Sequence, residues 1–188
     1  MKYSFSDWNH KSGTLPVHWQ DSDYENLKWH LHKKLQSGDI TNGYATAKSN
    51  IEIYKDQIGL LVPEFSVGDK AVIPKQVDEI FGYIINSFDL SDSIYTFNKY
   101  TPGMILPWHT DTYPTYSKNN NANIKQIVRV IVFLHDPAPG QQLWIGEKLC
   151  IGHKGTWHSW QGATRHMAAN LGETPRYTIQ ITGKSHGR

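Results

Sequence analysis

From residue 93 onward the chain is a succession of short apolar segments separated by Gly, Pro and Asn. This spacing is typical of antiparallel strands joined by tight turns. We predict strands at about 94–100, 104–109, 125–135, 142–150, 155–160, 164–170 and 175–182. Seven or eight such strands can bury their apolar faces together only by packing two sheets against each other. The pattern therefore predicts a mainly β fold, a double-stranded β-helix (jelly-roll) barrel.

The last predicted strand has two distinct faces. Successive side chains of a strand point to opposite sides, so residues two apart share a face. One face carries Arg176, Thr178, Gln180 and Thr182, and the other carries Tyr177, Ile179 and Ile181. We expect the apolar face to pack against helices and the polar face to line the barrel mouth. Segment 125–134 begins with Lys125 and Gln126 and is then apolar on both faces apart from Arg129, as expected of a central strand.

The first half of the chain is more helical. Apolar spacing predicts one helix from Asp21 to about Gly38 and a second from Pro74 to Phe88, which should pack on the outside of the sheet. At 188 residues we expect a single domain, 1–188, with 1–92 as N-terminal helical support and 93–183 as jelly-roll core. The remaining predictions are irregular structure at 1–20 and 38–50, a short strand at 51–54, and a loop at 119–123. The segment 112–124 is either a lid over the site or a bare solvent loop.

Composition narrows the function classes. The net charge is +2, so the total charge provides no attraction to nucleic acids or membranes. No apolar run is long enough to span a bilayer, and the first residues lack the apolar core of a signal peptide. The single cysteine, Cys150, has no internal disulfide partner and agrees with a reducing compartment. We therefore expect a cytoplasmic protein.

Three side chains of the predicted barrel are of the types that hold a divalent metal ion. His109 and Asp111 are two positions apart, which puts imidazole and carboxylate on one side of an extended segment. His166 follows 57 positions later, in another predicted strand. Two histidines and one carboxylate, with the other positions open, form the ligand set of non-haem Fe(II) oxygenases. His-x-Asp alone is weak evidence among 10 histidines and 17 acidic residues, and the polar face of a surface strand explains it equally well.

A basic residue ten positions after His166 adds weight to this hypothesis. Arg176 and Thr178 share one face of the last predicted strand. A guanidinium fork beside a hydroxyl suits a carboxylate, which it binds through two hydrogen bonds. The alternative is an ordinary arginine at a strand end.

With these residues in place, the chain resembles the 2-oxoglutarate- and Fe(II)-dependent dioxygenases, in particular the prolyl-hydroxylase-like branch. The resemblance covers about half of the chain and runs through 100–103, 109–111, 129–136, 140–143, 166–170 and 176–178. One departure is Gln141-Gln142, where many members of the family have a second glycine. A second is the N-terminal half, which matches no family pattern and leaves the substrate open.

The resemblance implies Fe(II), 2-oxoglutarate as cosubstrate and O2. It implies three metal ligands, His109, Asp111 and His166. It assigns Arg176 to the far carboxylate of 2-oxoglutarate, accompanied by the Thr178 hydroxyl. Tyr100 either donates a hydrogen bond to the cosubstrate from the opposite wall or is simply packed. A carboxylate at Asp111 argues against halogenation, since halogenating members of the family carry a small residue there.

The substrate is less constrained. Aromatic and polar side chains near the predicted mouth could grip a peptide, an amino acid or a small metabolite, or could be core: Trp108, Tyr113, Tyr116, Trp144, Trp157, Trp160, His158 and Arg129. His158 competes with His166 as third ligand, but its distance from Arg176 in the sequence fits the family less well. The favoured interpretation is a dioxygenase that hydroxylates one of these substrates with release of succinate and CO2. The alternative is a cupin-like jelly-roll module that binds a metal or ligand without oxygenase activity. The oligomeric state stays open.

Overall fold

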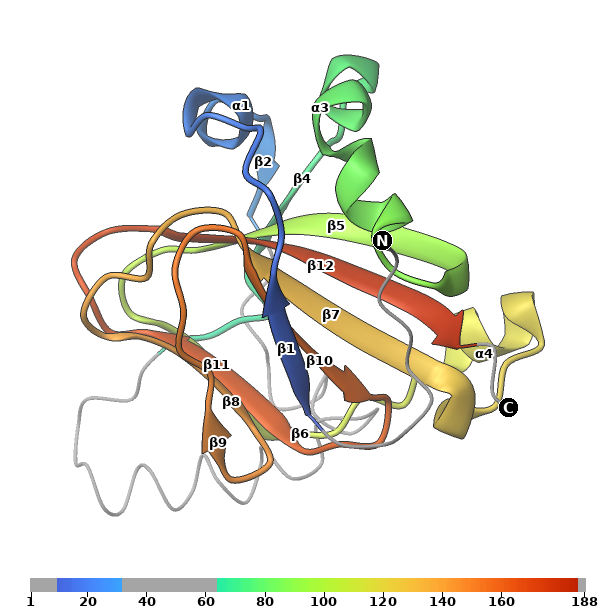
Figure 1. The fold of residues 1–188 in the computed structure, drawn as a ribbon. Helices are drawn as coiled ribbons and strands as arrows, with labels where there is room; N and C mark the ends of the chain where they lie inside the picture. The colour runs from blue at the N-terminus through green and yellow to red at the C-terminus, as the bar shows by residue number, and fades with distance from the viewer. Residues whose placement is uncertain (1–9, 32–63, 186–188) are drawn as a thin grey trace, which may run out of the picture.

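Two β-sheets facing each other form the body of the protein. The computed structural model describes residues 10–31 and 64–185, so the strand predicted at 51–54 and the turns predicted at 38–50 lie outside the described residues. In spatial order, the first sheet contains β1 (Lys11–Thr14), β10 (Thr156–Gln161), β7 (Ile127–Phe133), β12 (Arg176–Ser185), β5 (Leu90–Tyr100), β4 (Asp69–Ala71) and β2 (Trp29–His30). The second contains β3 (Glu64–Phe65), β6 (Met104–His109), β11 (His166–Asn170), β8 (Gln141–Ile145) and β9 (Lys148–Leu149). Figure 1 shows the two sheets and the helices outside the first. All pairings are antiparallel except that of β3 with β6. The predicted jelly-roll class is confirmed.

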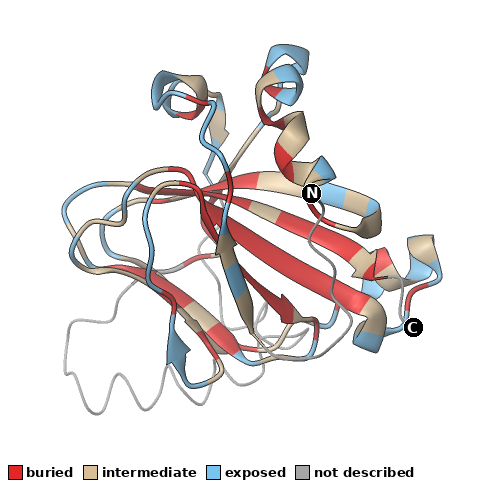
Figure 2. Cartoon of the chain, viewed as in Figure 1, coloured by how far each residue is buried: buried red, intermediate tan, exposed pale blue. Residues whose placement is uncertain are grey.

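Each strand predicted after residue 93 has a counterpart. The predicted strand 142–150 is divided into β8 and β9 by a turn in which Gly146 adopts a positive φ of 58°. Every residue of β7 is buried, and β7 lies between β10 and β12, as expected for a central strand. Figure 2 shows this buried band along β7, β10 and β12.

The helix predicted over 74–88 is α3 (Lys75–Asn86), and it covers the outer face of the seven-stranded sheet. Its buried residues Val77, Phe81 and Ile84 pack in one core cluster with the apolar face of β12. The Phe81 ring meets the Phe97 ring of β5 edge-on, with centroids 5.0 Å apart. The predicted packing of the apolar face of β12 against a helix is therefore confirmed.

The helix predicted from Asp21 to Gly38 is wrong within the described residues. Only α1 (Ser22–Glu25) is helical, and the chain then pairs as β2 with β4. Pairing across the sheet satisfies the backbone of Trp29 and buries part of its ring, which overrides the helical spacing of its neighbours. Residues 1–20 were predicted to be irregular, but β1 forms the edge strand of the large sheet beside β10.

The loop predicted at 119–123 is partly helical. Helix α4 (Pro114–Asn120) begins with proline in its first turn and is followed by a 3-10 turn, η2 (Ile124–Gln126). Tyr113 and Asn121 bracket α4 in the left-handed region, with φ values of 50° and 45°. Asparagine adopts that conformation readily, so Asn121 ends the helix. Among the helices in the described part of the chain, none has both the length and the apolar character to cross a bilayer.

Candidate metal centre and cavity

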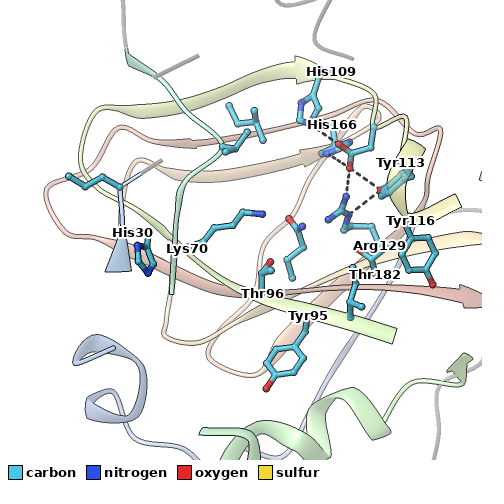
Figure 3. Close-up of a pocket in the computed structure, with 16 residues that line it drawn as sticks. His30, Lys70, Tyr95, Thr96, His109, Tyr113, Tyr116, Arg129, His166 and Thr182 are labelled. Atoms are coloured by element: carbon cyan, nitrogen blue, oxygen red, sulfur yellow. Dashed lines mark hydrogen bonds and ion pairs between the residues drawn. The ribbon is translucent and has the colours of Figure 1, made fainter. Parts of the chain in front are cut away.

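A cavity of about 790 Å³ opens into the barrel between the two sheets. Its lining includes His109, Asp111 and His166 on one side. On the side of the seven-stranded sheet it is lined by Lys70, Thr96, Arg129, Gln180 and Thr182. Figure 3 shows these side chains directed into the same space. The cavity therefore brings the predicted ligands together with a polar wall.

Strand pairing places the two histidines of this centre. His109 ends β6 and His166 begins β11, and the two residues are direct partners across these antiparallel strands. Their rings lie 4.2 Å apart between centroids. Asp111 lies two residues beyond the end of β6, whose bounds are those of the predicted strand 104–109, so it is a loop residue. The three ligand atoms all lie within 4.8 Å of one another.

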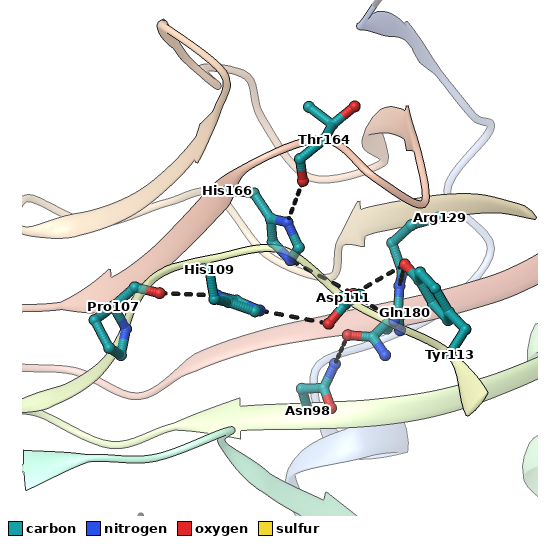
Figure 4. A network of polar contacts seen from close by, with 9 residues as sticks. All are labelled: Asn98, Pro107, His109, Asp111, Tyr113, Arg129, Thr164, His166 and Gln180. Carbon is teal, nitrogen blue, oxygen red and sulfur yellow. Dashed lines mark hydrogen bonds and ion pairs between the residues drawn. The ribbon is translucent and has the colours of Figure 1, made fainter. Parts of the chain in front are cut away.

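The ring nitrogens of both histidines are oriented by backbone carbonyls. Nδ1 of His109 lies 2.8 Å from the carbonyl oxygen of Pro107, and Nδ1 of His166 lies 2.9 Å from that of Thr164. A carbonyl only accepts, so each Nδ1 carries the proton and each Nε2 presents a lone pair. The Nε2 atoms lie 3.5 Å (His109) and 3.6 Å (His166) from the Asp111 carboxylate oxygens. Both are therefore ready to bind a metal ion through Nε2 (Figure 4).

Asp111 is held by two further side chains. Its Oδ2 accepts a hydrogen bond from Arg129 Nη2 at 2.7 Å and another from the Tyr113 hydroxyl at 2.9 Å. Arg129 Nε in turn donates to the Tyr113 oxygen at 3.0 Å, closing the network. With Oδ2 accepting both bonds, Oδ1 is the oxygen that lies on the His109 side. The network fixes the orientation of the carboxylate.

The surroundings of Asp111 and His166 favour the forms of these two groups that bind a metal ion. Burial alone would raise the pKa of the Asp111 carboxyl, but Arg129 and the two histidines lower it well below its usual range. Burial, with His109 nearby, lowers the pKa of His166 to about 3. The donor set near neutral pH thus includes an ionised carboxylate and a neutral imidazole, the forms that bind metal. The Nε2 atoms of His109 and His166 lie 3.5 and 3.6 Å from the Asp111 oxygens. In an octahedral shell with metal–ligand bonds of about 2.1 Å, neighbouring ligand atoms lie roughly 3.0 Å apart. A divalent metal ion fits this donor set.

The predicted cosubstrate residues lie elsewhere in the barrel interior. Arg176 begins β12 and pairs with Tyr100 at the end of β5. Both are buried, as is Thr178, and the Arg176 guanidinium lies 5.7 Å from the ring centroids of Tyr100 and Phe133. None of the three predicted cosubstrate residues, Tyr100, Arg176 and Thr178, belongs to the cavity lining, whereas Gln180 and Thr182, further along the same strand face, do. Within the described residues, Arg176 Nη2 is buried without a hydrogen-bond partner.

Sequence reasoning missed part of this centre. It assigned Arg129 and Tyr113 to a substrate rim, whereas both hold Asp111. Arg129 is the one charged residue of β7, a central strand that is otherwise apolar on both faces, and this was a usable indication. Lys70 was not singled out, because it lies on a three-residue strand with no recognisable pattern.

The predicted aromatic rim is only partly assembled. Tyr113 and Tyr116 line the cavity, and the Trp160 ring packs 4.6 Å from His166 between centroids. Trp157 lies instead on the outer face of its sheet, where it meets Phe88 edge-on at 5.3 Å. Its placement at the mouth was wrong, because the strict alternation along β10 sends neighbouring side chains to opposite faces.

His158, the competing third ligand, belongs to a different cluster. Its Nε2 donates to the Ile151 carbonyl at 3.0 Å, so its Nδ1 accepts from His10 Nε2 at 2.9 Å. Cys150 Sγ lies 3.8 Å from the same His10 nitrogen. Hydrogen bonds account for this cluster, and it does not reach His109 or Asp111. Of the two histidines, the structure brings His166 to the centre.

Comparisons with known proteins give distant structural matches. No family model and no curated protein matches the sequence. A prolyl-4-hydroxylase from Pseudomonas putida matches with 13% identity and a TM-score of 0.43, covering 88% of this chain and 97% of that chain. An oxidoreductase of the 2OG-Fe(II) oxygenase family from Burkholderia pseudomallei matches with 13% identity and a TM-score of 0.39, covering 61% of this chain and about half, 53%, of that chain. A cupin protein from Bacteroides fragilis matches with 14% identity and a TM-score of 0.37, covering 55% of this chain and 75% of that chain. Similarity at this level leaves function to be argued from the site.

Proposed function

We propose that this protein is a 2-oxoglutarate- and Fe(II)-dependent dioxygenase that hydroxylates an amino acid, a peptide or a small metabolite, releasing succinate and CO2. The observation that carries the proposal is the convergence of His109, Asp111 and His166 in a polar cavity, with each histidine oriented by its own carbonyl. Three protein ligands leave the remaining positions of a metal ion open. That is what a metal needs if cosubstrate and O2 are to bind it.

The chain's own residues would have distinct roles in this reaction. Fe(II) bound by these residues, together with 2-oxoglutarate, would supply the activation of O2 that is needed to hydroxylate an unreactive C–H bond. His109 and His166 would bind the metal through Nε2, while their Nδ1–H groups donate hydrogen bonds to the Pro107 and Thr164 carbonyl oxygens. Arg129 and Tyr113 hold Asp111 in one orientation, so the carboxylate needs no reorganisation when the metal arrives.

Arg176 is the proposed partner of the far carboxylate of 2-oxoglutarate. Its guanidinium is buried, and Nη2 has no hydrogen-bond partner within the described residues. An unpaired buried charge is costly, and an anionic ligand would offset that cost. Thr178 and Tyr100, on the same inward face and the neighbouring strand, are the proposed polar companions.

One observation favours a second candidate function. The cavity that contains the three ligands does not include Arg176 in its lining. A jelly-roll module that binds a metal or ligand without a cosubstrate has no use for Arg176. In that case its replacement would leave ligand binding unchanged.

Succinate formation tests the proposal. Purified protein with Fe(II), 2-oxoglutarate and O2 should release succinate even without a substrate, by slow uncoupled turnover. His166→Ala should abolish it, whereas Cys150→Ser, in the separate cluster, should not. Absence of succinate from metal-loaded native protein, across a panel of candidate substrates, would favour the binding module.

A further inference from the structure

Lys70 is a cation in the wall of the metal cavity that has no role in the proposed reaction. It lies on β4 and pairs with Asn98 of β5, which pairs with Thr178 of β12. Cross-strand partners share a face of the sheet, so Lys70 projects to the same inward side as Gln180 and Thr182. Figure 3 shows its side chain extended into the cavity toward the centre. The ammonium and the metal ligands therefore face a common space.

No described residue neutralises this ammonium. Lys70 has no hydrogen bond or ion pair with any residue in 10–31 or 64–185. Burial lowers the pKa of Lys70, and the positive charge of Arg129 lowers it further, with only partial compensation from Asp111. An anion that pairs with a partly desolvated cation offsets the cost of that desolvation.

Arg129, which also lines the cavity, already has partners among the described residues. Arg129 uses Nη2 for Asp111 and Nε for Tyr113. Arg176 lies outside the cavity lining. Of the lysine and arginine side chains in the described lining, Lys70 is therefore the one without an ion-pair partner. Beside it, Thr96 presents a buried hydroxyl that has no hydrogen-bond partner within the described residues and that faces the same cavity.

We propose that Lys70 is the anion anchor of this cavity: its ammonium binds a carboxylate of the molecule that fills the space between β4 and the three metal ligands. The inference rests on the proposed function for the identity of the occupants. The carboxylate belongs either to the cosubstrate or to the substrate, which would then be an acid.

A comparison of two keto acids tests whether the carboxylate bound by Lys70 belongs to the cosubstrate. Mn(II)-loaded protein is titrated without O2, by tryptophan fluorescence, with 2-oxoglutarate and with 2-oxopentanoate, which has the same length but no far carboxylate. If the anchored carboxylate is the far one of the cosubstrate, Lys70→Met should weaken 2-oxoglutarate binding about 10- to 100-fold and leave 2-oxopentanoate binding unchanged. Arg176→Met provides the same comparison for the other candidate cation.

A second titration tests the substrate source. Saturation-transfer NMR compares butyrate with butanol, with and without 2-oxoglutarate. If Lys70→Met retains 2-oxoglutarate binding but loses butyrate binding, the anchored carboxylate belongs to the substrate. Because this readout needs no metal, it tests Lys70 even if the native protein binds no keto acid, the outcome that would instead defeat the proposed function.

Lys99→Met is the matched control. Lys99 follows Asn98 on β5, but it projects to the opposite face, where its amine lies 5.8 Å from the Trp29 ring centroid and 5.9 Å from that of Tyr177. The Lys99→Met substitution removes the same charge from the same sheet, but outside the cavity. Lys70→Met and Lys99→Met behaving alike in both titrations, within a factor of two, would overturn the proposal.

Discussion

Arg129 Nη2 lies 2.7 Å from Asp111 Oδ2, in an ion pair whose members are both largely shielded from solvent. Removing one partner leaves the other as an uncompensated charge. We expect Arg129→Met to lower the free energy of unfolding of the metal-free protein by about 3 kcal/mol. The measurement is urea unfolding of the native protein, Arg129→Met, Asp111→Asn and the double variant. The double variant should lose clearly less than the sum of the two single losses. Additive losses would mean that the pair is not coupled.

Tyr113 bridges that pair, and its hydroxyl should matter for metal binding. Tyr113→Phe removes the bond to Asp111 Oδ2 and the acceptor for Arg129 Nε, while keeping the ring. Loss of such a supporting contact typically costs about 10- to 100-fold in metal affinity. Competition against a chelator measures it. Tyr116→Phe, whose hydroxyl bonds to the Asp92 carbonyl instead, is the control and should retain native affinity.

The sequence predicted the barrel well because its information is local there. Alternation along β12 separates Tyr177, Ile179 and Ile181 from the inward polar face. It failed at Trp29 and at β1, where the structure depends on pairing with strands far along the chain. Local spacing carries no information on such partners.

The same difference between local and long-range information applies to the residues of the candidate site. His109, Asp111 and His166 could be selected by residue type and spacing, and the structure brings them together. Arg129 and Lys70 could not be assigned their positions, since both reach the cavity only through cross-strand neighbours. Arg176 was selected by its distance from His166, yet it lies outside the lining of the cavity that holds the three ligands.

Arg176 should contribute to binding and not to stability. Burial lowers the pKa of its guanidinium, because the charged form loses its hydration. Arg176→Met should therefore leave the melting temperature unchanged or raise it, while weakening 2-oxoglutarate binding about tenfold or more. Thermal unfolding and ligand titration of one preparation measure the melting temperature and the affinity for 2-oxoglutarate. A large fall in melting temperature would mean that Arg176 is a structural residue.

His158 should make stability depend on pH. Burial, followed by the influence of His10, lowers its pKa to about 4 in the folded protein, against 6.5 as the ordinary value. Above about pH 6.5 the imidazole is neutral in both states and contributes no pH dependence. Between about 6.5 and 4 only the unfolded chain takes up the proton, so stability falls as pH falls, with a slope approaching 1.4 kcal/mol per pH unit. Below about 4 the contribution levels off.

The His158 prediction is measured as a difference between two proteins. Urea unfolding across this range should give a shallower slope for His158→Gln than for the native protein, by close to one proton. Equal slopes would show that His158 is not the group that titrates.

Two glycines with nearly the same φ allow the stability cost of backbone strain to be measured separately from the cost of steric contact. Gly103 has φ 86° and open space at the Cβ position, whereas a Cβ on Gly140, at φ 85°, would lie 2.5 Å from the Gly172 nitrogen. Gly103→Ala should cost about 1–2 kcal/mol from the left-handed backbone alone. Gly140→Ala should cost about 1–3 kcal/mol more, because backbone must move. Urea unfolding of the two variants measures both costs. Equal costs would contradict the close approach of the loops that contain Gly140 and Gly172.

The most direct test of the account is an absorption spectrum recorded without O2. Fe(II) and then 2-oxoglutarate are added to the native protein, and the visible metal-to-cosubstrate charge-transfer band is sought. The account predicts a band that His166→Ala abolishes and Arg176→Met weakens at subsaturating 2-oxoglutarate. Bound iron without a band in the native protein would contradict the dioxygenase assignment and leave a jelly-roll metal-binding module.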